Sequence, residues 1–301
     1  MTGNSLPSEA ISAVVVSYHP DMAALGSLCR CLQEAGLNVI VVDNSGPTFR
    51  FEFPSVGTQL ICMGENAGIA KAQNAGIAAA RKNGAQAVLF LDQDSRVQPE
   101  MLAVLRAAIA GQGPRIVGPL VIDEMPPHHE LPSQSLDVRG RSAAVFHAGR
   151  NAPYPVDIII ASGTMATLDV FELAGCMDER LFIDYVDSEW CLRCRQAGVP
   201  INIVPQAKLS HRIGERSFRV FGCVVFVHSP IRCYYQIRNA LILLRYPHWP
   251  RYFGIKQVIT VLTSRIILIF YADQKRALAK AILMGLLHGI IGKSGRADFQ
   301  P

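Results

Sequence analysis

One short segment, residues 87–95, restricts the possible folds more than any other part of the chain. Five apolar residues, Ala87 to Leu91, lead directly into two carboxylates, Asp92 and Asp94. A run this short, without a 3.6-residue period, predicts a strand that is buried on both faces. Such strands end at the carboxyl edge of an open α/β sheet, where ligands bind, and paired carboxylates there suit a hard divalent cation. A polar loop closing a buried strand would have the same sequence, because a bare Asp-x-Asp is common.

The first third of the chain alternates between predicted strands and predicted helices. The expected strands occupy residues 13–17, 38–42, 59–62 and 88–91. The expected helices occupy residues 21–35 and 67–83. This alternation implies right-handed crossovers and a mostly parallel sheet. Ser17, Asp43 and Asp92 stand at the ends of successive strands, so we expect these side chains to meet in one crevice.

The middle of the chain continues the pattern less regularly. We expect helices at residues 99–110, 168–174 and 187–196. We expect strands at residues 115–122, 156–160 and 201–204. Residues 123–141 contain Pro126, Pro127 and the pair His128–His129, and this composition predicts a surface loop or insertion.

A glycine-rich segment, Gly64 to Ala70, opens the second predicted helix. Glycines and an Asn at a helix start can direct backbone N–H groups toward an anion. The segment does not match the Gly-x-Gly-x-x-Gly fingerprint or the Lys-containing P-loop, which disfavours a dehydrogenase or a P-loop kinase. A simple turn before a helix remains the structural alternative.

Three acidic residues, Asp184, Asp187 and Glu189, lie close together beside aromatic side chains. Asp187 is a candidate helix N-cap, and Glu189 would then lie in the first turn. Capping alone explains either residue, but the surplus of acids favours a general base. His211 follows the last predicted strand, and a lone His is usually structural unless the fold returns it to the carboxylates.

The chain ends in apolar helical segments that carry basic residues. Residues 229–245, 255–271 and 274–292 are predicted helices, and we expect the last two to lie in a membrane interface rather than to span the bilayer. A helical cap on the core or a dimer face is the alternative. The formal net charge is +5 and dispersed, which implies no nucleic acid but suits an acidic ligand or an anionic membrane.

The cysteines and the start of the chain indicate a reducing compartment. Residues 1–10 contain no basic segment followed by an apolar stretch, so no signal peptide is expected. The eight cysteines are therefore expected to be reduced thiols. Cys191 and Cys194 have zinc-type spacing, but no second pair follows at zinc-ribbon distance.

Taken in order, these motifs resemble the family 2 inverting glycosyltransferases, and within them the bacterial L-rhamnosyltransferases. The resemblance covers residues 13–292. It rests on the strings Val-Asp-Asn, Glu-Asn-x-Gly, Leu-Asp-Gln-Asp-Ser, Ser-Gly-Thr, Phe-Ile-Asp-Tyr-Val-Asp-x-Glu-Trp and Tyr-Tyr-x-x-Arg-Asn. It implies an α/β fold of the GT-A type, with a Rossmann-like, mostly parallel central sheet and C-terminal amphipathic helices. The implied GT-A domain occupies residues 11–228, with a nucleotide-binding part at 11–122 and an acceptor-binding part at 142–228, and a helical extension follows at 229–295.

The resemblance also implies roles for individual residues. The expected donor-binding residues are Ser17, Tyr18, Asp43, Asn66, Gly68, Asp92 and Gln93. The expected ligands of a divalent cation, Mg²⁺ or Mn²⁺, are Asp92, Asp94 and His211. The expected acceptor-binding residues are Ser162, Gly163, Trp190 and Arg238. Asp187 matches the catalytic base, but Val186 stands where many relatives have another acid, so Asp184 remains an alternative.

The implied reaction is transfer of L-rhamnose from dTDP-L-rhamnose with inversion at the anomeric carbon. The expected acceptor is a lipid-linked saccharide in O-antigen or other cell-surface polysaccharide synthesis, and a rhamnolipid-type glycolipid is the alternative. The enzyme would then be cytoplasmic and peripherally bound to the inner membrane. A phosphatase of the haloacid dehalogenase type and a non-catalytic sugar-nucleotide-binding protein are the competing hypotheses from other classes.

Overall fold

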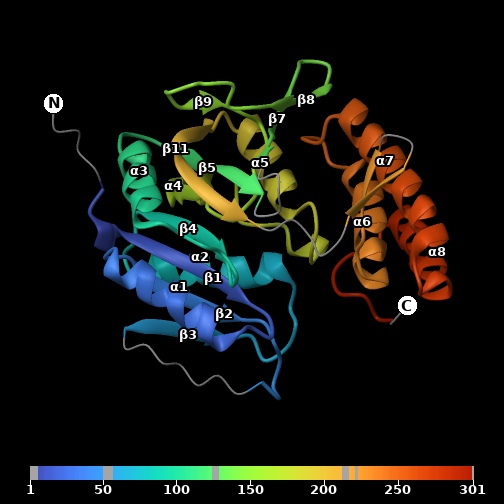
Figure 1. Ribbon diagram of the computed structural model, residues 1–301, viewed down its shortest axis with the longest axis horizontal. Coiled ribbons are helices and arrows are strands. Elements are labelled where there is room, and N and C mark those ends of the chain that lie inside the picture. Colours follow the sequence, from blue (N-terminus) through green and yellow to red (C-terminus); the bar gives the residue numbers. More distant parts are fainter. Residues whose placement is uncertain (1–5, 50–56, 124–128, 212–216, 221–222, 300–301) are drawn as a thin grey trace.

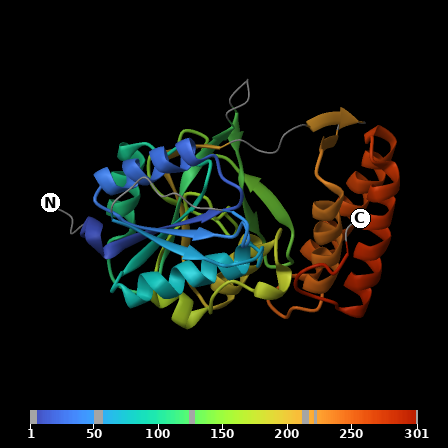
Figure 2. The same cartoon turned by 90° about the horizontal axis from the view of Figure 1, so that it is seen from below.

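The computed structural model describes residues 6–49, 57–123, 129–211, 217–220 and 223–299. An α/β body holds most of the chain, and three C-terminal helices stand together along one side of it (Figures 1 and 2). In the body, one large twisted sheet is covered by helices on both faces, so its central strands are buried.

The main sheet has the strand order β3-β2-β1-β4-β10-β5-β11-β9, and β6 pairs with β5 beside this path. β1 to β4 run parallel to one another, β5 and β11 are also parallel, and β10 is antiparallel to both of its neighbours. The sheet is therefore mostly parallel, as predicted. Its strands are β1 (Ile11–Ser17), β2 (Asn38–Asp43), β3 (Thr58–Cys62), β4 (Ala87–Asp92), β5 (Ile116–Asp123), β6 (Glu130–Leu131), β9 (Tyr154–Pro155), β10 (Met165–Thr167) and β11 (Ile201–His211).

Alternate residues of the buried strands pack on opposite faces of the sheet. Ala13 and Val15 of β1 pack with the helices α1 and α3, whereas Val14 and Val16 pack with α2, α4 and α5 on the other face. The helices of the body are α1 (Met22–Glu34), α2 (Ile69–Lys82), α3 (Pro99–Ile109), α4 (Asp169–Leu173) and α5 (Val186–Gln196), with short 3-10 turns at Ser8–Ala10 and Glu179–Leu181.

The register of the parallel strands brings their polar ends to one edge. Ser17 of β1 lies opposite Asp43 of β2, and Val16 lies opposite Asp92 of β4. The convergence expected from the sequence is therefore present in the structure. It follows from the shared direction of the strands, which stop at nearly the same level.

One sequence-based assignment in the middle of the chain is wrong, and a second is incomplete. Residues 156–160 do not form a strand: the strand here is β9, and Ile158 makes only an isolated bridge with Gln134. Residues 129–141 are not simply a loop, because they contain β6 and also β7 (Ser133–Leu136), which pairs with β8 (Ser142–Val145). Pro126, Pro127 and His128 lie outside the described residues.

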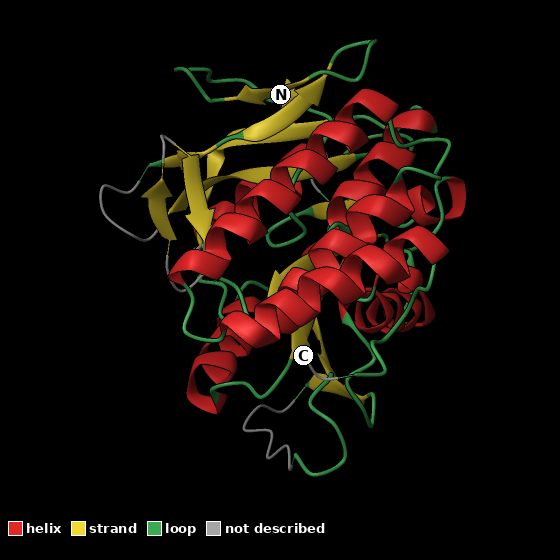
Figure 3. Ribbon diagram, turned by 90° about the vertical axis from the view of Figure 1, so that its right-hand side faces the viewer, coloured by secondary structure: helices red, strands yellow, loops and turns green. Residues whose placement is uncertain are grey.

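The C-terminal helices are α6 (Pro230–Leu243), α7 (Arg251–Tyr271) and α8 (Lys275–Ile291), and a hairpin of β12 (Ser217–Val220) and β13 (Cys223–Phe226) precedes them. Figure 3 turns this side of the molecule toward the viewer. Gly289 allows α8 to approach α6 closely, since a Cβ there would lie 2.7 Å from Leu241 Cδ1. Among the described residues, α7 is the one helix long and apolar enough to cross a membrane by length and composition. We expected neither residues 255–271 nor residues 274–292 to supply enough apolar residues for a span, and this expectation is wrong for α7.

Candidate active site

The turn after β4 displays the two carboxylates of the Asp-x-Asp motif. Asp92 is partly buried at the strand end, and Asp94 is exposed. The turn is closed by Ser95, whose Oγ accepts from the Asp92 N–H at 3.0 Å and whose N–H donates to the Asp92 carbonyl at 3.1 Å. Ser95 Oγ also lies 2.9 Å from Ser162 Oγ. Ser95 and Ser162 therefore fix the turn from behind and leave its carboxylates at the edge of the sheet.

Gln93, between the carboxylates, joins this turn to the end of β1. Its Oε1 accepts from the Tyr18 N–H at 2.6 Å, and its Nε2 donates to the Tyr18 carbonyl at 3.2 Å. The Gln93 amide is thus used inside the protein. The Tyr18 ring is 48% exposed and can stack on a planar ligand at this edge.

The end of β2 is a buried polar cluster around Asp43. Its Oδ1 accepts from Ser17 Oγ at 3.3 Å, from Ser45 Oγ at 2.6 Å and from the Ser45 N–H at 3.2 Å. The next residue, Asn44, was not singled out from the sequence, although it belongs to the Val-Asp-Asn string. Asn44 Nδ2 donates to Asn66 Oδ1 at 3.1 Å, so the end of β2 holds the glycine-rich segment.

The glycine-rich segment does not present a row of free N–H groups to an anion. The N–H of Ala67 donates to Asn44 Oδ1, that of Gly68 to Asn66 Oδ1, and that of Ile69 to the Phe182 carbonyl. Gly68 has φ +87°, and a Cβ there would lie 2.6 Å from the Phe182 ring. Glycine is needed at position 68 because the segment packs tightly against residue 182, which corrects the anion-cradle interpretation.

Asp187 lies in the first turn of α5, one residue after its start at Val186, so it is not the N-cap. Tyr185 takes the cap position with φ +64°. Asp187 Oδ1 accepts from the Ser188 N–H at 2.8 Å, and the residue borders a small apolar pocket that Phe90 and Ile160 also line. Burial raises the pKa of Asp187 above its usual value, and the nearby negative charge of Asp184 adds to this, despite the backbone hydrogen bonds that oppose the shift.

Asp184, the alternative base, is held by α6. Arg232 Nε donates to its two carboxylate oxygens at 3.1 and 3.3 Å, and Gln236 Nε2 donates at 3.4 Å. The Asp184 carboxylate therefore joins the segment before α5 to two side chains of α6.

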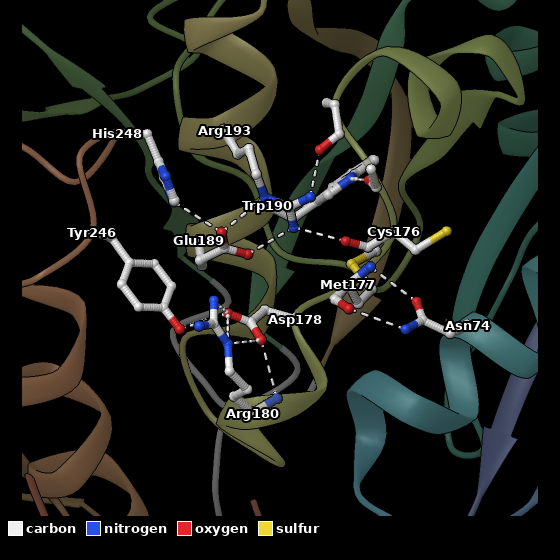
Figure 4. Close-up of polar contacts among 12 residues, drawn as sticks. Asn74, Cys176, Met177, Asp178, Arg180, Glu189, Trp190, Arg193, Tyr246 and His248 are labelled. Carbon is white, nitrogen blue, oxygen red and sulfur yellow. Dashed lines mark hydrogen bonds and ion pairs between the residues drawn. The ribbon is translucent and has the colours of Figure 1, made fainter. Parts of the chain in front are cut away.

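Glu189, also in the first turn of α5, is bonded to neighbouring side chains within the protein (Figure 4). Glu189 contacts Arg193 Nε at 2.8 Å and His248 Nε2 at 2.8 Å, and its side chain is 2% exposed. Burial alone would raise the pKa of Glu189, but its bonds with His248 and Arg193 outweigh burial and leave that pKa below its usual value. Glu189 is therefore a structural anion, not a base.

Trp190 and Arg238 are not placed to contact an acceptor, which corrects both expectations. Trp190 is 2% exposed, stacks on Phe171 with ring centroids 5.2 Å apart, and donates to the Gly175 carbonyl (Figure 4). Arg238 is fully buried, and its Nη2 donates to the Leu181 carbonyl at 2.9 Å. The local sequence does not show that these two side chains are buried, because their burial depends on elements distant in the chain.

Ser162 and Gly163 are also buried rather than open to an acceptor. Ser162 is 3% exposed and bonded to Ser95. Gly163 has φ +81°, and a Cβ there would lie 2.7 Å from Pro119 Cγ. Both residues are therefore packed inside the protein, and the Ser162 hydroxyl is already bonded to Ser95.

The oxygen donors at the sheet edge fit a divalent cation shared with a phosphate ligand. Mg²⁺ is commonly held by one or two carboxylates plus substrate phosphates rather than by a complete protein cage. Asp92 and Asp94 supply that number, and the described residues contain no group of three or more candidate ligands. An isolated bridge between Arg96 and Ser210 brings the turn beside the end of β11, where His211 follows. The side chain of His211 lies outside what the structure describes.

Comparison with known proteins agrees with this architecture. The sequence matches the family model for glycosyl transferase family 2 over residues 24–171. It is 38% identical over 287 residues to the dTDP-rhamnosyl transferase RfbF of Shigella flexneri, and the match covers 95% of this chain and 97% of that protein.

Solved structures of low sequence identity share the fold. GalNAc-T7, solved with UDP, GalNAc and Mn²⁺, superposes with a TM-score of 0.58 at 14% identity, and covers 93% of this chain but only 56% of its own. TarS of S. aureus in complex with UDP-GlcNAc gives a TM-score of 0.54 at 13% identity, with 93% of this chain and 81% of its own covered. The chain thus spans little more than half the length of GalNAc-T7. Together with the mostly parallel sheet and the carboxylates at its edge, these comparisons show that the chain is a GT-A glycosyltransferase and belongs to glycosyl transferase family 2.

Proposed function

We propose that the enzyme transfers L-rhamnose from dTDP-L-rhamnose to a hydroxyl of a saccharide acceptor, with inversion at the anomeric carbon. The observation that carries the donor assignment is the 38% identity to a dTDP-rhamnosyl transferase along almost the whole of both chains. The fold supports the same class, because nucleotide ligands of open α/β sheets bind at the carboxyl ends of the strands, where Ser17, Asp43 and Asp92 meet.

The donor is proposed to bind at this edge through residues 11–122. Tyr18 stacks on the nucleobase, the buried Asp43 cluster supports the sheet edge beneath the ribose, and the turn of Asp92 and Asp94 faces the diphosphate. Asn66, Gly68 and Gln93 shape the site by holding its loops together, since their amides or backbone N–H groups are bonded within the protein. A divalent cation, when held by Asp92, Asp94 and His211, would neutralise charge on the leaving diphosphate.

The acceptor is proposed to approach from the side of residues 142–228, where Asp187 lies. The Asp187 carboxylate removes the proton of the acceptor hydroxyl as the hydroxyl oxygen bonds to the anomeric carbon of rhamnose. In the same step the bond between that carbon and the dTDP oxygen breaks. A single displacement of this kind inverts the configuration. The raised pKa of Asp187 suits this role, because a more basic carboxylate accepts the proton more readily once it is ionised.

The donor assignment is tested by thermal stabilisation with a panel of sugar nucleotides in the presence of Mn²⁺. A ligand at 100 times its Kd stabilises the native state by about 2.7 kcal/mol, so dTDP-L-rhamnose should raise the Tm by several degrees. We expect UDP-GlcNAc and GDP-mannose to raise it much less. Equal shifts for all sugar nucleotides would contradict the donor assignment, and release of phosphate from a simple phosphate ester would favour the phosphatase hypothesis.

We further propose that the enzyme works at the cytoplasmic face of the inner membrane, on a lipid-linked acceptor of the O-antigen type. Support comes from an exposed apolar stripe on α7, defined here as Ile255, Ile259, Ile266 and Phe270, which are 49–72% exposed and recur at helical spacing. Leu283, Leu287 and Ile290 form a similar exposed row on α8. Exposed basic residues, among them Lys256 and Lys280, accompany both rows and complement anionic lipids. A glycolipid acceptor of the rhamnolipid type would use the same surface.

The double variant Ile259→Ser/Phe270→Ser should lose binding to vesicles that contain phosphatidylglycerol. Burial of each large apolar side chain contributes about 1.5–3 kcal/mol, so vesicle affinity should fall at least about tenfold in a sedimentation assay. The control is Leu173→Ser, which changes an exposed apolar residue on α4 of the α/β body. Unchanged vesicle binding, with a change in oligomeric state instead, would identify the stripe as a subunit interface.

A further inference from the structure

The four residues that precede the helix of Asp187 have an unusual backbone. In this segment, Phe182 to Tyr185, which we call the base loop, three non-glycine residues have φ between +63° and +66°. Elsewhere in the described chain only two non-glycine residues, His19 and Ala148, have positive φ. Such conformations are strained and persist only where the surrounding structure holds them. The base loop must therefore be held in place by specific contacts.

Asn239 of α6 bonds the backbone of this segment directly. Its Nδ2 lies within hydrogen-bonding distance of the carbonyl oxygens of Leu181, Ile183 and Asp184, at 2.9, 2.8 and 3.2 Å. Its Oδ1 accepts from Arg238 Nε at 2.9 Å, so the orientation of the amide is fixed. Asn239 is fully buried, and three backbone carbonyls of the loop region would lose a donor without it.

The base loop contacts both halves of the proposed active site. On one side, the Phe182 carbonyl accepts from the Ile69 N–H at 2.8 Å, and Gly68 packs against the Phe182 ring, so the loop supports the start of α2. On the other side, the Tyr185 carbonyl accepts from the Glu189 N–H at 2.8 Å. That bond closes the first turn of α5, which carries Asp187. A shift of the base loop would therefore move Asp187 relative to the donor.

We propose that Asn239 is a positioning residue for sugar transfer, which fixes the base loop and thereby the place of the Asp187 carboxylate relative to the acceptor hydroxyl. This inference rests on the proposed role of Asp187 as the base. Asn239 touches neither donor nor acceptor in this assignment. The C-terminal helices, beyond any contact with lipid, then complete the active site, because α6 is the element that holds the base loop.

The test is a double-mutant cycle between Asn239→Ala and Asp187→Asn, with kcat measured at saturating donor. Asn239→Ala should lower kcat by about 10²-fold, the effect expected for a misplacement of about 1 Å. The affinity for dTDP, measured by calorimetry, should change far less. In the Asp187→Asn background, Asn239→Ala should have little further effect on kcat, because the group that it positions has lost its function. A loss of the same size in both backgrounds would overturn the proposal.

Two further variants keep the result interpretable. Asn74→Ala removes a comparable loop-holding amide, which bonds the backbone of Met177 at 2.9 and 3.0 Å, and should leave kcat near normal (Figure 4). Arg232→Gln removes only the guanidinium contact with the Asp184 carboxylate, through a side chain that is 45% exposed, and covers the case in which Asn239→Ala does not fold. It should lower kcat and show the same non-additivity with Asp187→Asn. Full kcat in folded Asn239→Ala would overturn the positioning role, and if only Arg232→Gln folds, full kcat in that variant would do the same. Full kcat in Asp187→Asn alone would instead overturn the assignment of the base.

Discussion

Asp187→Asn should reduce the rate of sugar transfer by about 10²–10⁴-fold, the usual contribution of a general base, while donor binding stays near normal. Asn matches Asp in size and can still accept the hydrogen bond from the Ser188 N–H, which lies 2.8 Å from Asp187 Oδ1. The substitution removes the basic carboxylate and little else. Transfer by the purified variant and dTDP binding by calorimetry measure the two quantities separately.

The stability of the variant gives an independent check. A raised pKa means that ionised Asp187 opposes folding, so its contribution to stability is greatest below the unfolded pKa and is lost as the pH rises through the folded pKa. At neutral pH, Asp187→Asn should therefore fold at least as stably as the wild type. A large loss of stability would identify Asp187 as a structural anion instead.

The pH dependence separates the two candidate bases. Because the pKa of Asp187 is raised, the acid limb of kcat/KM should lie above the value of about 3.9 for an ordinary Asp. Asp184→Asn removes a negative charge that contributes to this shift, and it leaves Arg232 nearby, so the acid limb should move to lower pH. Turnover should persist in Asp184→Asn. If that variant is inactive and Asp187→Asn has ordinary turnover, Asp184 is the base.

The sheet and its functional edge could be predicted from the sequence because their signals are local. The apolar run before Asp92 marks a buried strand, and Asp21 marks the start of α1, where its carboxylate accepts from the N–H groups of Ala23 and Ala24. Once the alternation of strands and helices indicates a parallel sheet, the meeting of Ser17, Asp43 and Asp92 follows from strand direction. No long-range contact has to be known for any of these steps.

Predictions that depend on burial failed because contacts between distant segments decide it. Trp190 lies among Phe90 and Phe171, and nothing in the local sequence distinguishes it from an aromatic platform for sugar. The antiparallel strand β10 has only three residues, too few for a periodic signal. Asn239 was visible in the Tyr-Tyr-x-x-Arg-Asn string, but its role depends on carbonyls more than fifty residues earlier in the chain.

Asp92→Asn and Asp94→Ala should each abolish measurable transfer and weaken binding of the dTDP-sugar. A carboxylate pair at the diphosphate supplies the negative charge that holds a divalent cation, and an amide or a methyl group does not. EDTA should have the same effect on the wild-type enzyme, and excess Mn²⁺ should restore activity after EDTA but not in the variants. His211→Ala should cost less, and it should change the preference between Mn²⁺ and Mg²⁺ if His211 is a ligand.

Asp92→Asn is the sharper of these variants because it keeps the backbone hydrogen bonds of the turn. The two hydrogen bonds between Asp92 and Ser95 use the backbone N–H and carbonyl of residue 92, so an Asn there keeps both of them. A loss of activity with an unchanged Tm would then result from the missing charge rather than from a displaced turn. Asp273→Asn, at an exposed acid between α7 and α8, controls for the change in net charge and should be fully active. Full transfer by Asp92→Asn, or by the wild type in EDTA, would show that the carboxylates serve the turn and not a cation.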